Sequence, residues 1–193
     1  MEQTFVMVKP DGVKRGLTGE VLKRFERSGL KLVAIKMLEP SLELLHKHYN
    51  TTHEDTILRL GGKTLATYEK YGRDAKADFG TNDPKDLGKM VVEWLVKYMQ
   101  SGPVVAMVLE GRHAVDNVIS LVGSTMPVSA PGGTIRGDYS TDSAAYANIE
   151  RRGVMNIVHA SGSIEEAKFE VALWFDPTEF HSYKRVEEHL VED

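Results

Sequence analysis

At the centre of this sequence stands an uninterrupted apolar run, Val104-Val105-Ala106-Met107-Val108-Leu109. A run of this length without polar alternation is typical of a strand that is buried on both faces. A helical pattern over Met90–Met99 precedes it and ends at Ser101-Gly102-Pro103. The run therefore predicts a strand that is buried on both faces.

Further strands are predicted on both sides of this run in the sequence. Thr4 to Val8 is short and rich in β-forming residues, and it enters the tight turn Lys9-Pro10-Asp11-Gly12. Leu30 to Leu38 is rich in Val, Ile and Leu, which predicts a mostly buried strand. Met155 to Val158 predicts a short strand.

Helical patterns separate the strands. Ser163-Ile164-Glu165-Glu166 fits the capping box S-x-x-E and predicts the start of the last helix. The other helices are predicted from near Thr18 to Ser28-Gly29, from Ser41 through Leu42, Leu45 and Tyr49, over Met90–Met99, and over Arg112–Val122.

This order of elements predicts two βαβ-like halves in an α+β fold (α/β in the broad sense). We expect a ferredoxin-like sandwich, a four-stranded antiparallel sheet with helices packed on one face. Residues 1–193 would form a single domain with two insertions, near 50–89 and 139–154. The first is the least regular part of the chain and reads as an insertion or lid, and 127–139 is expected to be a long ordered loop.

Composition excludes several classes of protein. The chain has 193 residues, a net charge of -4 and no cysteine, so disulfides, thiolate catalysis and Cys-ligated metal sites are excluded. A mildly acidic chain does not favour a broad nucleic-acid-binding surface. No secretory signal is visible at the N-terminus, and the longest apolar run is too short to cross a bilayer. We expect a cytoplasmic protein with no membrane partner.

His159 is the first candidate for chemistry, in Asn156-Ile157-Val158-His159-Ala160-Ser161-Gly162-Ser163. A strand delivers the imidazole to its end, and a capped helix follows whose free N–H groups favour an anion. A neutral histidine can accept a phosphoryl group if its tautomer is fixed. Glu170, on the same helix, could accept from the other ring N–H. Taken alone, such a histidine is more often structural.

Two other segments could contact phosphate. Lys9 ends the first strand and offers a point charge with rotatable donors. Arg136 lies in the glycine-flanked loop Gly132-Gly133-Thr134-Ile135-Arg136-Gly137-Asp138, which suits a bidentate contact. Neither segment matches a P-loop or a Rossmann fingerprint, and each alone is more often an ordinary surface turn.

Taken together, the segments resemble the nucleoside diphosphate kinase family. They occur in the family's order and cover most of the chain outside the two insertions. The matching segments are 4–13, Arg15-Gly16-Leu17 with Gly19-Glu20, 101–107, Pro131-Gly132 with 134–138, 156–163, and Glu170 with Leu173-Trp174-Phe175. The resemblance implies ping-pong transfer of a terminal phosphoryl group from a nucleoside triphosphate to a nucleoside diphosphate.

By this resemblance, His159 matches the histidine that carries the phosphoryl group, and Glu170 matches the glutamate that orients it. Tyr49 and Ser161 match the tyrosine and the serine beside that histidine. The resemblance also implies Mg2+ bound with the nucleotide rather than in an all-protein cage. It further implies a homo-oligomer, commonly a hexamer or a tetramer.

The nucleotide-binding residues are carried over in the same way. Lys9, Arg136 and Asn156 match residues that contact the phosphates or the ribose, and Thr125 in Gly123-Ser124-Thr125-Met126-Pro127 matches a phosphate-contacting threonine. The partners expected from the resemblance are therefore nucleoside di- and triphosphates.

The sequence departs from the family where the nucleotide is usually clamped. An arginine common six residues before the threonine is Ile119 here. The family usually has a second arginine and a base-stacking phenylalanine, and their nearest counterparts here are Lys89 and Val91. Arg59 and Arg73 in the insertion are candidate substitutes.

Other differences lie close to the histidine. Gly162 replaces a common acidic residue, and the second insertion carries Tyr146, Arg151 and Arg152. We expect base stacking and one β-phosphate contact to be rebuilt from inserted residues or partly lost.

Two alternatives remain open at this point. The changed clamp would suit a non-catalytic nucleotide-binding member of the same fold, although His159, Lys9, Arg136 and Glu170 are intact. A ferredoxin-like sheet also hosts nucleic-acid-binding modules, but these need exposed strand aromatics and a basic face. The predicted strands offer only Phe5 for that purpose.

Overall fold

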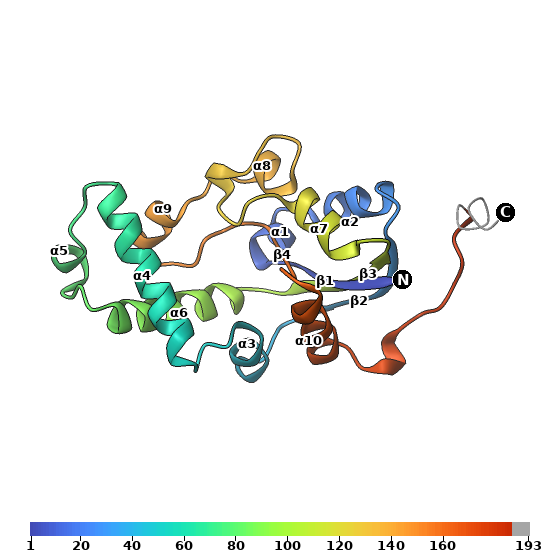
Figure 1. Cartoon of the computed structure of the whole chain (residues 1–193), viewed down its shortest axis with the longest axis horizontal. Coiled ribbons are helices and arrows are strands. Elements are labelled where there is room, and N and C mark those ends of the chain that lie inside the picture. Colours follow the sequence, from blue (N-terminus) through green and yellow to red (C-terminus); the bar gives the residue numbers. More distant parts are fainter. Residues whose placement is uncertain (187–193) are drawn as a thin grey trace.

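The structure is a computed structural model that describes residues 1–186. Its sheet contains β1 (Glu2–Val8), β2 (Lys31–Leu38), β3 (Val104–Gly111) and β4 (Val158–Ala160), paired antiparallel in the order β2-β3-β1-β4 (Figure 1). Met7 of β1 pairs with Ala106 on one side and with His159 on the other. The ferredoxin-like sheet expected from the sequence is confirmed.

Helices cover both faces of this sheet, so the expectation of helices on one face was wrong. Val105, Met107 and Leu109 of β3 pack in one core with α2 (Thr18–Arg27) and α7 (Ala114–Val122). The alternate residues of β3 face a second core formed with α3 (Leu42–Tyr49), α6 (Pro84–Met99) and α10 (Ile164–Trp174). An unbroken apolar strand requires cover on both faces, because successive side chains point to opposite sides.

β2 lies at the edge of the sheet and is less buried than expected. Val33 and Ala34 are buried, but Ile35 is 46% exposed and Met37 is 61% exposed. A segment near the C-terminus covers only the start of this edge, where the His181 N–H donates to the Val33 carbonyl at 2.9 Å. Apolar content alone did not distinguish an edge strand from a central one.

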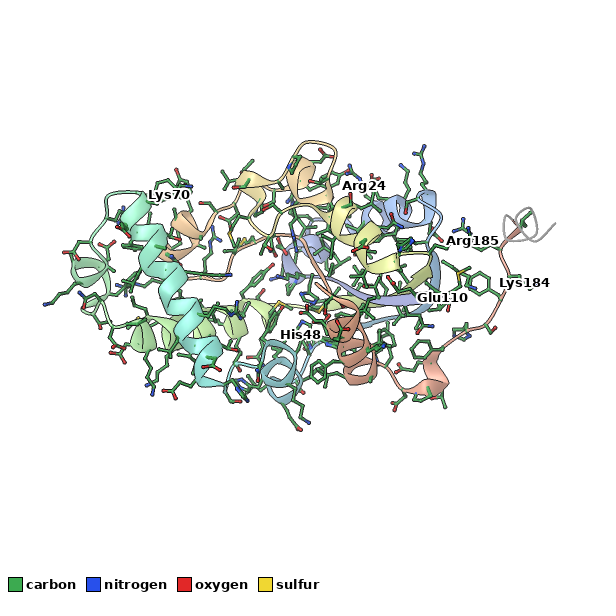
Figure 2. The ribbon with its side chains drawn as sticks, viewed as in Figure 1. Arg24, His48, Lys70, Glu110, Lys184 and Arg185 are labelled. Carbon is green, nitrogen blue, oxygen red and sulfur yellow. The ribbon has the colours of Figure 1, made fainter. Side chains whose placement is uncertain are left out.

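The stretch 50–89 is helical, contrary to expectation. α4 (Glu54–Lys70) and α5 (Ala75–Phe79) precede α6, which begins at Pro84 rather than Met90. The Asp83 carboxylate caps α6 by accepting from the N–H groups of Lys85 and Asp86, and Pro84 is at the first helical position. We call residues 54–90 the helical projection, and Figure 2 shows Lys70 at its outer end.

Two glycines allow α4 and α6 to pack backbone to backbone. A Cβ on Gly61 would lie 1.7 Å from the Pro84 carbonyl oxygen, and one on Gly88 would lie 1.9 Å from that of Ile57. Tyr68, Ala75 and Leu87 form a separate small core in the helical projection. The glycines that suggested an irregular segment are thus interior residues of two crossing helices.

Short elements complete the chain, and several differ from expectation. The predicted loop 127–139 contains the 3-10 helix η1 (Pro127–Ser129) and α8 (Ile135–Tyr139), whose cap is Thr134. The predicted strand 155–158 is instead β4, which starts at Val158. The remaining elements are α1 (Pro10–Lys14), α9 (Ala144–Ile149) and η2 (Pro177–Glu179). No helix within residues 1–186 is long and apolar enough to span a bilayer.

Candidate active site

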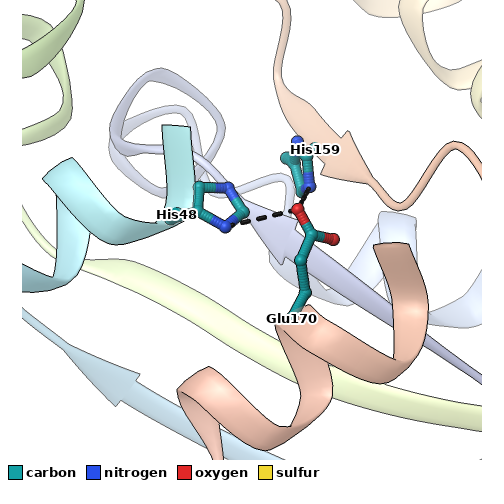
Figure 3. Close-up of side chains that lie close together, drawn as sticks. All are labelled: His48, His159 and Glu170. Carbon is teal, nitrogen blue, oxygen red and sulfur yellow. Dashed lines mark hydrogen bonds and ion pairs between the residues drawn. The ribbon is translucent and has the colours of Figure 1, made fainter. Parts of the chain in front are cut away.

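β4 pairs antiparallel with β1. This pairing places His159 beside Met7, one residue before the end of β1. α10 crosses the same end of the sheet and carries Glu170, which points toward His159 (Figure 3). The His159 Nε2 lies 2.8 Å from Glu170 Oε1, and the Ser161 hydroxyl donates to Glu170 Oε2 at 2.5 Å. An ionised carboxylate can only accept, so Nε2 carries the proton of neutral His159.

His48 of α3 is a site residue that the sequence reasoning missed. Its side chain is fully buried, and its Nδ1 lies 3.3 Å from Glu170 Oε1, the same oxygen that faces His159 (Figure 3). The indole N–H of Trp174 donates to the same Nδ1 at 3.2 Å. The only sequence signal was the place of His48 in a helix, directly before Tyr49. We call His48, His159, Ser161 and Glu170 the catalytic cluster.

A second group of polar residues lies around the end of β1 and the start of β4. The Lys9 Nζ donates to Asn156 Oδ1 at 2.7 Å, and Asn156 Nδ2 donates to the Thr125 carbonyl at 3.0 Å. Arg136 of α8 donates to the carbonyls of Gly123 and Val158, both at 2.8 Å. The structure therefore brings these predicted nucleotide-binding residues together. Lys9, Asn156 and Arg136 are buried, whereas Thr125 is exposed.

Three buried polar atoms near His159 lack a hydrogen-bond partner among the described residues. They are the His48 Nε2, the Tyr49 hydroxyl oxygen and the Arg136 Nε. The Tyr49 ring centroid lies 6.3 Å from that of His159. A buried polar atom without a partner is costly, so it indicates a site where a ligand supplies the missing bond.

The pKa shifts follow from burial and from two cations. Burial, then the charges of Lys9 and Arg136, hold the pKa of His159 well below its usual value. The ring is therefore neutral and keeps a lone pair for nucleophilic attack. Burial raises the pKa of Glu170, an effect opposed by the charge of His48 and the hydroxyl of Ser161.

The pKa values of the two cations, Lys9 and Arg136, are also lowered. Burial and then the charge of Arg136 lower the pKa of Lys9 to about 7, an effect that the charge of Asp11 opposes. Burial lowers the pKa of Arg136 to about 10. Like charges held in a buried space are favourable only when an anion joins them, so both shifts indicate an anion-binding site.

The backbone before His159 is strained. Ile157 has a φ of 69°, and the Val158 N–H donates to the Asn156 carbonyl at 2.7 Å, which closes a γ-turn. A positive φ is unfavourable for a β-branched residue, with a cost of roughly 1–3 kcal/mol. This turn explains why β4 begins only at Val158. It also separates Asn156, beside Lys9, from His159, beside Glu170.

The predicted clamp residues lie apart from both groups. Lys89 is exposed and Val91 half-buried on α6, and in residues 1–186 no hydrogen bond, ion pair or ring contact joins either to His159 or Arg136. Ile119 is an exposed residue of α7. Tyr146 is exposed on α9.

The inserted arginines are mostly engaged within the insertions. Arg73 pairs with Asp78, Arg151 donates to the Asp78 carbonyl, and Arg152 pairs with Asp142 and Glu150. Arg59 is exposed on α4 and has no hydrogen bond or ion pair with another described residue.

The start of α10 offers less to an anion than the sequence suggested. The Ser163 hydroxyl accepts from the Glu166 N–H at 3.1 Å, as the capping box predicts. The Glu166 carboxylate, however, accepts from the Gly162 N–H at 2.8 Å rather than from Ser163. Because these donors are already bonded, the anion site is better explained by Lys9 and Arg136.

Comparison with known proteins gives a consistent result. A family model described as nucleoside diphosphate kinase matches residues 2–59 and 84–180. The nucleoside diphosphate kinase of Pyrobaculum aerophilum is 49% identical over 175 residues, covering 91% of this chain and 95% of the relative.

Solved structures agree. The crystal structure of an NDP kinase from Pyrobaculum aerophilum has a TM-score of 0.87 at 48% identity and covers 92% of this chain and 97% of the other. A transition-state mimic of the Borrelia burgdorferi nucleoside-diphosphate kinase, with bound vanadate and ADP, has a TM-score of 0.78 at 36% identity. That match covers 97% of this chain and 94% of the other. With its histidine–glutamate pair and its buried cations in one fold, this chain belongs to the nucleoside diphosphate kinase family.

Proposed function

We propose that this chain transfers the terminal phosphoryl group of a nucleoside triphosphate to a nucleoside diphosphate, through a phosphohistidine at His159. One observation carries the proposal. Glu170 holds the proton on the His159 Nε2, and none of the hydrogen bonds in residues 1–186 uses the Nδ1. The tautomer is therefore fixed with Nδ1 as the nucleophile.

In the first half-reaction, the Nδ1 lone pair attacks the terminal phosphorus. The bond between that phosphorus and the bridging oxygen breaks, and the nucleoside diphosphate leaves with the electron pair. The ring gains positive charge, which the adjacent Glu170 carboxylate stabilises at 2.8 Å. The second half-reaction is the reverse, with another diphosphate as the acceptor.

Lys9 and Arg136 would neutralise the charge on the transferring group, where most catalysis of phosphoryl transfer lies. The unpartnered Arg136 Nε and Tyr49 hydroxyl would bond to its oxygens. Asn156 would hold Lys9 in place, and Thr125 would contact the phosphates from the exposed side.

A divalent cation fits this site only as part of the nucleotide. Within residues 1–186, the one group of candidate metal ligands is His48, His159 and Glu170. Two imidazoles and one carboxylate do not suit Mg2+, which prefers oxygen ligands and retains water. We infer that Mg2+ enters on the phosphates, where it would offset their charge.

Incubation with a triphosphate labelled at its terminal phosphate tests the proposal. The expected product is an acid-labile phosphoprotein that loses its label when a diphosphate is added. His159→Ala should abolish labelling, whereas His181→Ala, at an exposed position, should leave it intact. Labelling that persists in His159→Ala would contradict the proposal.

We further infer that the chain forms a homo-oligomer, with the outer edge of β2 as one contact. Ile35 and Met37 expose apolar surface there, beyond the part covered by the C-terminal segment. An open strand edge with apolar side chains readily pairs with another strand. Light scattering should show more than one chain per particle, and Met37→Lys should lower that number. An unchanged particle mass in Met37→Lys would exclude this edge.

A further inference from the structure

The strained γ-turn at Ile157 is held from outside by the start of α1, which replaces the tight turn predicted after β1. The Ile157 N–H donates to Asp11 Oδ2 at 3.0 Å, and the Ile157 carbonyl accepts from the Lys9 N–H at 2.8 Å. Both polar backbone groups of the strained residue are therefore bonded to Lys9-Pro10-Asp11-Gly12. Gly12 permits this approach, because a Cβ there would lie 2.9 Å from the Ile157 carbonyl oxygen.

Asp11 is also fixed through its second oxygen. The Tyr98 hydroxyl donates to Asp11 Oδ1 at 2.5 Å. Tyr98 is a buried residue near the end of α6, and its ring lies against the backbone of Gly153. One carboxylate, in the first turn of α1, thus joins the last turn of α6 to the residue two positions before His159.

This arrangement matters because the γ-turn is not stable by itself. A β-branched residue relaxes toward negative φ unless the surrounding structure fixes it. Such a relaxation would rotate the peptide groups on both sides of Ile157. Asn156 would then move relative to Lys9, and His159 would move relative to Glu170.

We propose that Asp11 and Tyr98 are positioning residues that hold the strained turn, and with it His159, in the geometry that phosphoryl transfer requires. Neither residue needs to touch the nucleotide. The inference rests on the function proposed above, because it assumes that His159 is the group whose position matters. A purely structural role would lower stability without changing the rate at which folded protein is phosphorylated.

Single substitutions provide the first test. The single-turnover rate of His159 phosphorylation and the Kd of the diphosphate are measured beside the unfolding midpoint. We expect Tyr98→Phe to lower the rate about tenfold and Asp11→Ala to lower it further, with little change in Kd. Asp11→Asn should recover part of the rate, because its amide can accept from Ile157 and donate to the Tyr98 oxygen.

Matched controls make the same chemical changes elsewhere. Tyr183→Phe removes a hydroxyl that donates to the Leu32 carbonyl at 2.7 Å. Asp74→Asn alters a carboxylate that accepts from the Lys76 N–H at 2.9 Å in the helical projection. Both controls should keep the wild-type rate.

A second test addresses the strain directly. Ile157→Ala and Ile157→Gly both remove the buried side chain, but only glycine accepts the positive φ without strain. We expect Asp11→Ala to slow phosphorylation about tenfold in the alanine background and several-fold less in the glycine background. If Asp11→Ala lowered the rate by the same factor in both backgrounds, Asp11 would not act by holding the strained backbone. If the Ile157 variants do not fold, the Tyr98→Phe result alone decides.

The outcomes also separate this inference from the proposed function. A wild-type protein that forms no phosphohistidine would overturn the proposed function itself. If Tyr98→Phe and Asp11→Ala were phosphorylated as fast as the wild-type protein, only the positioning role would be overturned. A fall in the unfolding midpoint without a fall in rate would have the same meaning.

Discussion

Two glutamates, one in the catalytic cluster and one in the helical projection, differ in burial and in bonding. Glu170, in the catalytic cluster, is 1% exposed and bonded through both oxygens to His159 and Ser161. Glu54, at the start of the helical projection, is exposed and pairs with Lys85 at 2.5 Å. A buried carboxylate must have its partners in place, whereas an exposed ion pair contributes little to stability.

The same contrast extends to the surroundings. The catalytic cluster lies where β1, β4, α3 and α10 meet, and a strained turn at Ile157 precedes β4. The helical projection has a small core of its own, and residues 60–83 within it lie outside the match to the family model. The site thus consists of a few densely bonded, buried groups, whereas the projection is held by helix packing around its own small core.

The largest predicted effect concerns the buried glutamate. Glu170→Gln keeps the side-chain volume but removes the charge that stabilises the phosphorylated ring, so we expect His159 phosphorylation to slow by about a hundredfold or more. Glu54→Gln, at an exposed residue of the helical projection paired with Lys85, is the control and should change the rate little. Single-turnover labelling measures both variants. Comparable losses would mean that burial does not separate the two regions.

A backbone contact provides the largest effect in the helical projection. Gly61→Val would place a Cβ 1.7 Å from the Pro84 carbonyl oxygen, so α4 and α6 must separate. We expect a loss of about 3 kcal/mol in unfolding free energy. Gly62→Ala meets no atom within 4 Å and should stabilise the helix by about 0.5–1 kcal/mol. Urea unfolding compares the pair, and a harmless Gly61→Val would refute the tight crossing.

The strands were predictable from sequence because their apolar runs are a direct consequence of burial. The run at 104–109 predicted a strand buried on both faces, and the order of elements gave the sheet. The helices of the projection were not recognised, because Gly61 and Gly62 resemble loop residues when their helical neighbours are unseen. The start of α6 does have a local signal, because Asp83 is a favoured N-cap residue and Pro84 a favoured first helical residue.

The roles of the site residues were predictable only where the family resemblance reached. Local patterns made His159, Glu170, Lys9 and Arg136 candidates, the resemblance assigned their roles, and the structure brings them together. His48 and Asp11 act through other residues across the fold, so no local pattern marks them. Long-range contacts of this kind depend on how helices and strands pack, which the sequence pattern alone does not specify.

Lys9 allows a quantitative test of the buried cation site. Its pKa is lowered to about 7, mainly by burial, so at about pH 8.5 the empty site holds mostly neutral lysine. A bound diphosphate would favour the charged form and return this pKa toward its ordinary value, a rise of about three units or roughly 4 kcal/mol. Binding at that pH should therefore take up close to one proton.

Calorimetry in two buffers of different ionisation enthalpy measures this uptake. Near about pH 6 the lysine is already charged in the empty site, so its contribution should disappear. Lys9→Met should remove the uptake at the higher pH, whereas Lys89→Met, at an exposed position on α6, should retain it. Proton uptake that survives in Lys9→Met would assign the anion site to other groups.

The smallest predicted effect lies where the two inserted segments meet. Arg151 donates to the Asp78 carbonyl at 3.0 Å and lies 5.9 Å from the Phe79 ring centroid, but its own φ is 52°. Arg151→Ala removes both contacts and keeps the unfavourable φ, so we expect a loss of up to about 1 kcal/mol in unfolding free energy. Arg151→Gly removes the same contacts but relieves the backbone, which should recover about 1 kcal/mol. Urea unfolding should therefore rank the glycine variant close to wild type, with unchanged phosphoryl transfer in both. A loss of nucleotide affinity instead would show that Arg151 leaves Asp78 for the ligand, and the helical projection would then belong to the nucleotide site.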